Sequence, residues 1–170
     1  MTAYLRLFWG ICLLRQRPDA LPHSRWLLSL LLGLHVLLGA VIEVVAETPT
    51  RMPLLAALFS TAGMVAMTVL LLHVRGYLNR VVQTLTALAG CDLVIGLLLL
   101  PLLGLAGVDP AFVAALALAW FGLLLWNIAI AGHILRHAIE VPFWVGVFIA
   151  VGMVAVMMGV IGPLVLENTP

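Results

Sequence analysis

Five long runs of apolar residues dominate the chain, and short polar segments separate them. The runs are Trp26–Val45, Pro53–Val74, Val81–Gly107, Ala111–Leu135 and Val141–Leu166. A membrane-spanning helix needs about 20 mainly apolar residues, and each run provides them. The connections are too short to hold a soluble domain, so consecutive helices must be antiparallel neighbours. The pattern predicts an all-α, polytopic membrane bundle of five transmembrane helices over residues 26–170.

The segment before these runs, residues 1–25, has a different pattern. On a helical wheel, Thr2 and Arg6 fall on one side of Thr2–Leu14. The other side carries apolar residues, namely Tyr4, Leu5, Phe8, Ile11 and Cys12. Such a pattern is typical of a helix in the headgroup region, with its arginines toward anionic lipid. We therefore predict a cytoplasmic, interfacial amphipathic helix ahead of the bundle.

The composition supports a membrane location. Of the 170 residues, 65% are hydrophobic and 9% are charged, whereas a soluble domain has roughly 45–50% apolar and about 25% charged residues. The net charge of +1 argues against a nucleic-acid partner, which needs a strongly basic surface. The lipid bilayer is therefore the expected partner.

The arginines predict the orientation of the bundle. With the N-terminus inside, seven of the eight basic residues lie on the inner side and only Arg51 lies outside. The seven are Arg6, Arg15, Arg17, Arg25, Arg75, Arg80 and Arg136. This positive-inside bias predicts a cytoplasmic N-terminus and, after five spans, an outer C-terminus. We expect a bacterial cytoplasmic (inner) membrane.

Asp92 and His35 are the candidate binding residues. Asp92 stands twelve positions past Arg80, about 18 Å along a helix, and His35 stands ten past Arg25, about 15 Å. Their depths are therefore similar, near mid-bilayer, where an ionised side chain is costly and often functional. The two could form a proton or cation site of a small transporter or proton-handling subunit. A simple structural hydrogen bond between helices is the plainer interpretation.

Two other histidines suggest a redox alternative. A b-type haem needs two imidazoles at equal depth on facing helices. His73 and His133 both lie near the inner ends of their runs, and His137 shares a helix face with His133. They are the candidate ligands of an alternative haem- or quinone-binding redox subunit. Our main expectation is no cofactor and no metal.

Other noticeable residues have plainer interpretations. Cys12 precedes the first run and Cys91 lies deep in the third, so we expect them too far apart for a disulfide. Core filling explains Met153, Met157 and Met158, and packing explains Trp126 and Asn127. Small residues four positions apart are expected to pack helices together, within the bundle or between copies. These pairs are Ala56/Ser60, Ala57/Thr61, Ala115/Ala119, Gly146/Ala150 and Ala155/Gly159.

The organisation resembles the Yip1-type membrane proteins. The stretch Trp120–Trp126, leading into Gly132–Ala138, is similar to the late spans of that family. The resemblance implies five closely spaced spans and a membrane-organising or interaction role without catalysis. The family's long cytoplasmic N-terminal domain has no counterpart here, and no site residue carries over. We therefore expect a non-catalytic scaffold or interaction component, since no catalytic motif is found in the sequence.

Overall fold

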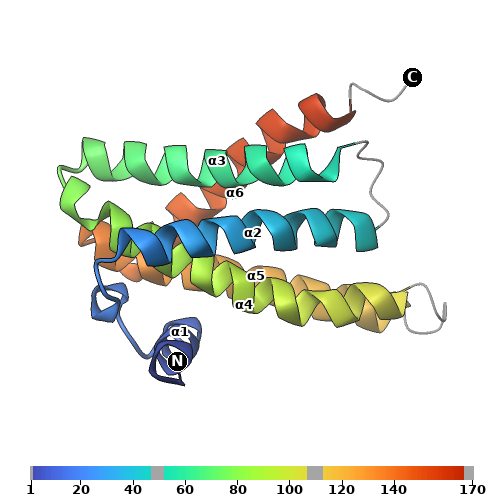
Figure 1. Ribbon diagram of the computed structural model, residues 1–170, viewed down its shortest axis with the longest axis horizontal. Coiled ribbons are helices and arrows are strands. Elements are labelled where there is room, and N and C mark those ends of the chain that lie inside the picture. Colours follow the sequence, from blue (N-terminus) through green and yellow to red (C-terminus); the bar gives the residue numbers. More distant parts are fainter. Residues whose placement is uncertain (1, 47–51, 107–112, 167–170) are drawn as a thin grey trace.

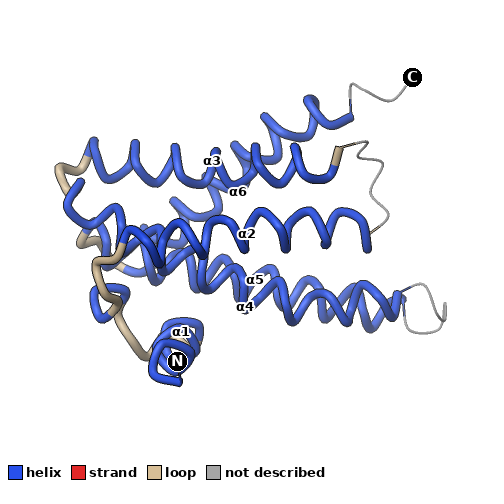
Figure 2. Tube along the Cα trace, in the orientation of Figure 1, coloured by secondary structure: helices blue, strands red, loops and turns tan. Residues whose placement is uncertain are grey.

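The computed structural model describes residues 2–46, 52–106 and 113–166. The described residues form helices joined by short loops, without a strand among them (Figure 2). Its elements are α1 (Thr2–Cys12), η1 (Pro18–Ala20), α2 (Arg25–Val45), α3 (Pro53–Val74), η2 (Leu78–Arg80), α4 (Val81–Ala106), α5 (Val113–Ile139) and α6 (Phe143–Leu166). The predicted all-α class is confirmed.

The helix boundaries follow local chemistry. The Ser24 side chain accepts a hydrogen bond from the Leu27 backbone N–H at 3.3 Å and so caps α2. Proline at the first position of α3 needs no intrahelical N–H partner. The predicted end of the fourth run at Leu135 is wrong, because α5 continues to Ile139. It ends there because Glu140 adopts a left-handed backbone, with φ of 57°.

Within the described residues, four helical segments are long and apolar enough to cross a membrane, so the chain is a multi-pass membrane protein. They are Arg25–Val45, Pro53–Val74, Leu78–Leu105 and Val113–Ile139. The α6 helix has 24 residues. Its apolar stretch Phe143–Gly159 is shorter than the four spans above. The fifth span therefore stays a prediction. The predicted run ends Gly107 and Ala111 lie outside the described residues.

The α4 helix is the central element of the bundle. It packs against α2, α5, α3 and α1, and 33% of its most apolar stretch is buried, compared with 6% for α2. The α6 helix packs against α5 and α3 and leans across the other helices (Figure 1). Asp92 thus stands on the helix that has most neighbours.

The α1 helix lies across the bundle, so that Figure 1 looks nearly along its axis. Its predicted apolar face is confirmed for Phe8, Ile11 and Cys12, all buried. That face packs on α4 and α5, whereas the sequence suggested lipid. The Trp126 indole N–H donates to the Cys12 carbonyl at 2.8 Å, and the Trp9 and Trp126 rings meet edge to face with centroids 6.4 Å apart.

The expectation that the two cysteines lie far apart is wrong. Cys12 and Cys91 have no exposed surface and belong to one apolar cluster. Their thiols lie next to each other, and both are free. The depth argument failed because α1 crosses the bundle beside the middle of α4, where Phe8 lies against Gly90.

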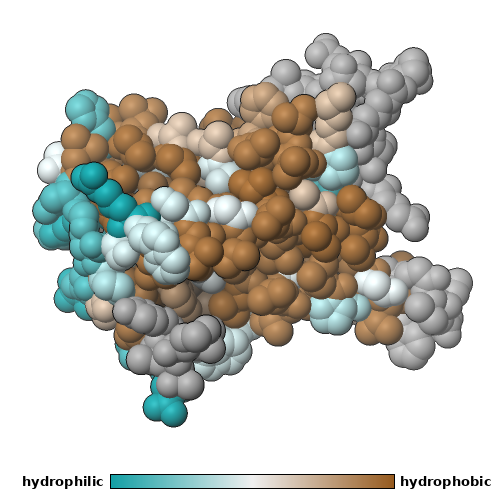
Figure 3. All heavy atoms as spheres, viewed as in Figure 1, coloured by the Kyte–Doolittle hydropathy of each residue, from teal (hydrophilic) through white to brown (hydrophobic). Residues whose placement is uncertain are grey.

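Polar residues gather at one end of the bundle, where α3 ends and α4 begins (Figure 3). Arg80 Nη2 contacts Glu140 Oε1 at 2.6 Å, and Arg80 Nη1 donates to the His137 and Ala138 carbonyls at 3.3 and 3.1 Å. The arginine thereby caps the last turn of α5. The Arg80 guanidinium, helped by the Tyr77 hydroxyl, lowers the pKa of the Glu140 carboxyl below its ordinary value.

We predict that Gly90→Ala releases α1 from the bundle. A Cβ at position 90 would collide with the rigid Phe8 ring, and overpacking of this kind costs about 1–3 kcal/mol. Mass spectrometry should then find Cys12 alkylated faster by a maleimide than in the parent protein. Gly104→Ala on the same helix is the control, because a Cβ there meets nothing within 4 Å. Equal alkylation of the two variants would contradict the docking of α1 at Gly90.

Candidate functional site

Asp92 and His35, the two residues singled out by depth, come together inside the bundle. His35 on α2 places Nε2 3.5 Å from Asp92 Oδ2 on α4. On its other side, His35 Nδ1 lies 2.9 Å from Thr61 Oγ1 on α3. The Thr61 hydroxyl donates to the Ala57 carbonyl at 2.8 Å. Three helices are thus joined by one line of polar contacts.

The direction of these hydrogen bonds determines the tautomer of His35. The single hydroxyl hydrogen of Thr61 goes to Ala57 O, so Thr61 Oγ1 must accept from His35 Nδ1–H. The Nε2 atom then faces the carboxyl of Asp92. Without a proton between them, two lone pairs would oppose each other. One proton between them, either as acid and imidazole or as carboxylate and imidazolium, would satisfy both atoms.

Both of these one-proton forms carry no net charge. The separation of 3.5 Å exceeds a normal hydrogen-bond length, so neither form is fixed by a short bond. The side chains remain 20% exposed for His35 and 25% exposed for Asp92. The pair is therefore only partly enclosed.

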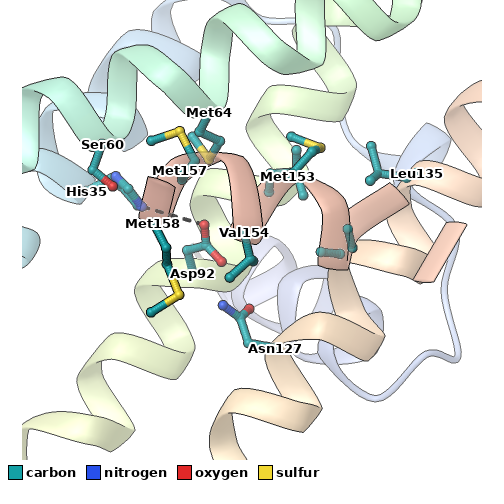
Figure 4. Close-up of a pocket in the computed structure, with 13 residues that line it drawn as sticks. His35, Ser60, Met64, Asp92, Asn127, Leu135, Met153, Val154, Met157 and Met158 are labelled. Carbon is teal, nitrogen blue, oxygen red and sulfur yellow. Dashed lines mark ion pairs between the residues drawn. The ribbon is translucent and has the colours of Figure 1, made fainter. Parts of the chain in front are cut away.

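A cavity of about 280 Å³ explains this exposure (Figure 4). Helices α2 to α6 all contribute to its wall. The polar residues of the wall are His35, Ser60, Asp92 and Asn127. Four methionine side chains also line the cavity: Met64, Met153, Met157 and Met158.

Asn127 has a different environment from the packing role expected of it. Its Oδ1 atom is buried without a hydrogen-bond partner. Figure 4 shows the amide beside the Asp92 carboxyl group, with its nitrogen on the nearer side. A buried polar atom without a partner costs free energy unless a ligand or water satisfies it. Asn127 therefore borders the cavity with a buried amide oxygen that no described group satisfies.

The methionines of α6 are also more than scattered filling. Met157 fits against Gly63 of α3, where any Cβ would collide with its Sδ atom. Met64 and His35 join Met153 and Met158 in the wall of the same cavity. Sequence reasoning found no partner for these methionines, because the neighbours of α6 cannot be read from hydropathy alone.

The two candidate haem ligands, His73 and His133, have different surroundings. His73 is exposed at the end of α3. His133 is buried, and its Nε2–H donates to the Gln16 carbonyl at 2.9 Å, so that nitrogen is not free to bind iron. Among the described residues, no group of three or more His, Cys, Asp or Glu side chains could hold a metal ion. A Soret band lost in His133→Ala would be needed to support the redox alternative.

No protein family, curated protein or solved structure matches this chain. The resemblance to the Yip1-type proteins therefore stays a prediction. Function has to be argued from the site itself.

We predict that Thr61→Val destabilises the bundle. Valine has the shape of threonine but no hydroxyl, so the His35 Nδ1–H would lose its acceptor, at a cost of about 1–3 kcal/mol. Thermal unfolding in detergent measures the effect. Thr61→Ser is the control, because it keeps the acceptor. Equal melting temperatures for the valine and serine variants would show that this hydrogen bond does not hold His35.

Proposed function

We propose that this chain binds and releases a proton at Asp92 and His35, as a small transporter or proton-handling subunit of a membrane. One observation carries the proposal: an imidazole of fixed tautomer faces a carboxyl group beside a cavity. A functional role is the default hypothesis for an ionisable residue at this depth.

The charges of the Asp92–His35 pair favour a proton that is exchanged over one that is bound permanently. In its one-proton state the pair is neutral, which suits an apolar bundle. Loss of the proton leaves one negative charge next to the cavity, and gain of another leaves one positive charge. Either change is costly in the membrane unless an ion of opposite charge compensates it. A cavity beside the pair gives such an ion a place to bind.

A membrane-organising or interaction role is the second candidate. It is supported by small residues that none of the described helices covers. Ala57 is buried, with its Cβ 3.2 Å from the position of a Cβ on Gly39, so this small-residue contact serves the bundle itself. Ala115 and Ala119 on α5 are instead exposed and suit close packing against another helix. Asp92 and His35 would then be structural.

We further propose that the N-terminus faces the cytoplasm of a bacterial inner membrane, with five spans. The arginine distribution supports this orientation. A reporter enzyme fused after Pro170 should then be active on the outer face, and one inserted at 75–80 on the inner face. A cytoplasmic signal from the C-terminal fusion would contradict the five-span topology.

The proton proposal predicts that the ¹⁵N chemical shift of the His35 ring titrates together with the carboxylic-acid infrared band of Asp92. The two should change over the same pH interval, because they share one proton. Asp92→Asn should remove the band and uncouple the ring while leaving the melting temperature nearly unchanged, since asparagine keeps the shape and can donate to Nε2.

His73 provides an internal control, because it is exposed and outside the site. Its titration should be the same in the parent protein and in Asp92→Asn. A His35 ring that does not titrate, or that titrates identically in Asp92→Asn, would contradict the proton proposal and favour the structural role.

A further inference from the structure

The cavity beside Asp92 is rich in hydrogen-bond acceptors and contains no permanent cation. Its described lining has no Lys or Arg. The Asp92 carboxyl group and the unpartnered Asn127 Oδ1 both accept hydrogen bonds. A ligand that replaces the shared proton must therefore bring N–H donors and a positive charge.

The rest of the wall is apolar and polarisable. Four methionine thioethers and residues such as Leu88 and Val154 face the space. Methionine adapts to irregular apolar ligands and makes favourable contacts with aromatic rings. An apolar cavity of about 150 Å³ admits benzene, so about 280 Å³ has room for a ring or branched alkyl group together with an amine.

The cavity borders the lipid-facing surface of the bundle. Ser60 on α3 is exposed, and Val154 and Met158 on α6 are 39% and 72% exposed. All three contribute to its lining. A ligand that partitions into the bilayer could thus enter between α3 and α6 without crossing the polar end of the bundle.

We propose that this cavity binds a lipophilic primary amine in its ammonium form, seated between Asp92 and Asn127 Oδ1 in place of the proton that Asp92 and His35 share. This inference rests on the proposed function, because Asp92 must give up that proton. The balance is simple: one ammonium ion enters, one proton leaves, and no covalent bond of the ligand changes. His35 stays neutral, with its Nδ1–H on Thr61. The site is neutral before and after.

Few other ionisable groups lie near enough to Asp92 to complicate this exchange. The groups that face it are the His35 imidazole from α2 and the thiols of Cys12 and Cys91 from α1 and α4. Helices α3, α5 and α6 present Ser60, Asn127 and methionines to the cavity. Amine binding should therefore release one proton. Its affinity should rise about tenfold per pH unit while the pair holds its proton and the amine stays charged.

The test uses the full chain in lipid nanodiscs, with benzylamine as the probe and empty nanodiscs as the partition control. Calorimetry at three pH values, all below the interval in which His35 and Asp92 lose their shared proton, should show the tenfold rise per pH unit. Benzyl alcohol, which has the same shape without the charge, should bind weakly and independently of pH. Asp92→Asn should weaken benzylamine binding tenfold or more.

Asn127→Leu provides the second variant. Since Asn127 Oδ1 has no partner among the described residues, this change should leave the melting temperature unchanged or higher, while benzylamine binding weakens. Equal affinities for the amine and the alcohol, or equal amine binding by the parent protein and Asp92→Asn, would overturn the proposal. The amine proposal would also be overturned if the methionines bound Ag⁺ and the protein did not bind benzylamine.

The two proposals fail in different ways. If the His35 ring and the Asp92 carboxyl titrate together but benzylamine does not bind, the amine assignment is wrong and the proton site stands. If they do not titrate together, the proton site itself is wrong.

Discussion

A carboxyl group in the middle of an apolar helix needs a partner, and the contacts around Asp92 meet this need. Asp92 lies on α4, the helix with most neighbours, and its partner His35 comes from α2. His35 is in turn held by Thr61 on α3, whose hydroxyl donates to its own helix. In lipid, helices gain little from hydrophobic burial against each other. This line of polar contacts therefore supplies much of the specificity with which α2, α3 and α4 associate.

The docking of α1 controls the rotation of the two helices that carry the cavity's acceptors. Cys91 and Trp126 contact α1, through the Cys12 thiol and the Cys12 carbonyl. The next residue along each helix, Asp92 or Asn127, lines the cavity. Adjacent residues on an α-helix point about 100° apart. Fixing one of each pair against α1 therefore directs the other into the cavity, which links the first residues of the chain to the site.

The sequence allows the helices and the depth of the site to be predicted, but not the neighbours of each helix. Hydropathy marks where a span begins and ends, and the rise per residue places Asp92 and His35 at similar depths. A helix that is apolar all round has no face that identifies its neighbour. For this reason the contact of Cys12 with Cys91 and the gathering of methionines around the cavity escaped sequence reasoning. Asn127, a single amide in an apolar run, was the one available signal.

The arrangement around Asp92 favours binding over a purely structural role. A structural link between α2 and α4 would be stronger with a short, enclosed contact between the two side chains. The observed contact is 3.5 Å long, both side chains keep some exposure, and the neighbouring space is about 280 Å³. An unpartnered amide oxygen on Asn127 adds a further cost. Each of these features weakens the bundle on its own. Together they suit a charged guest that neutralises Asp92, satisfies Asn127 and fills the space among the methionines.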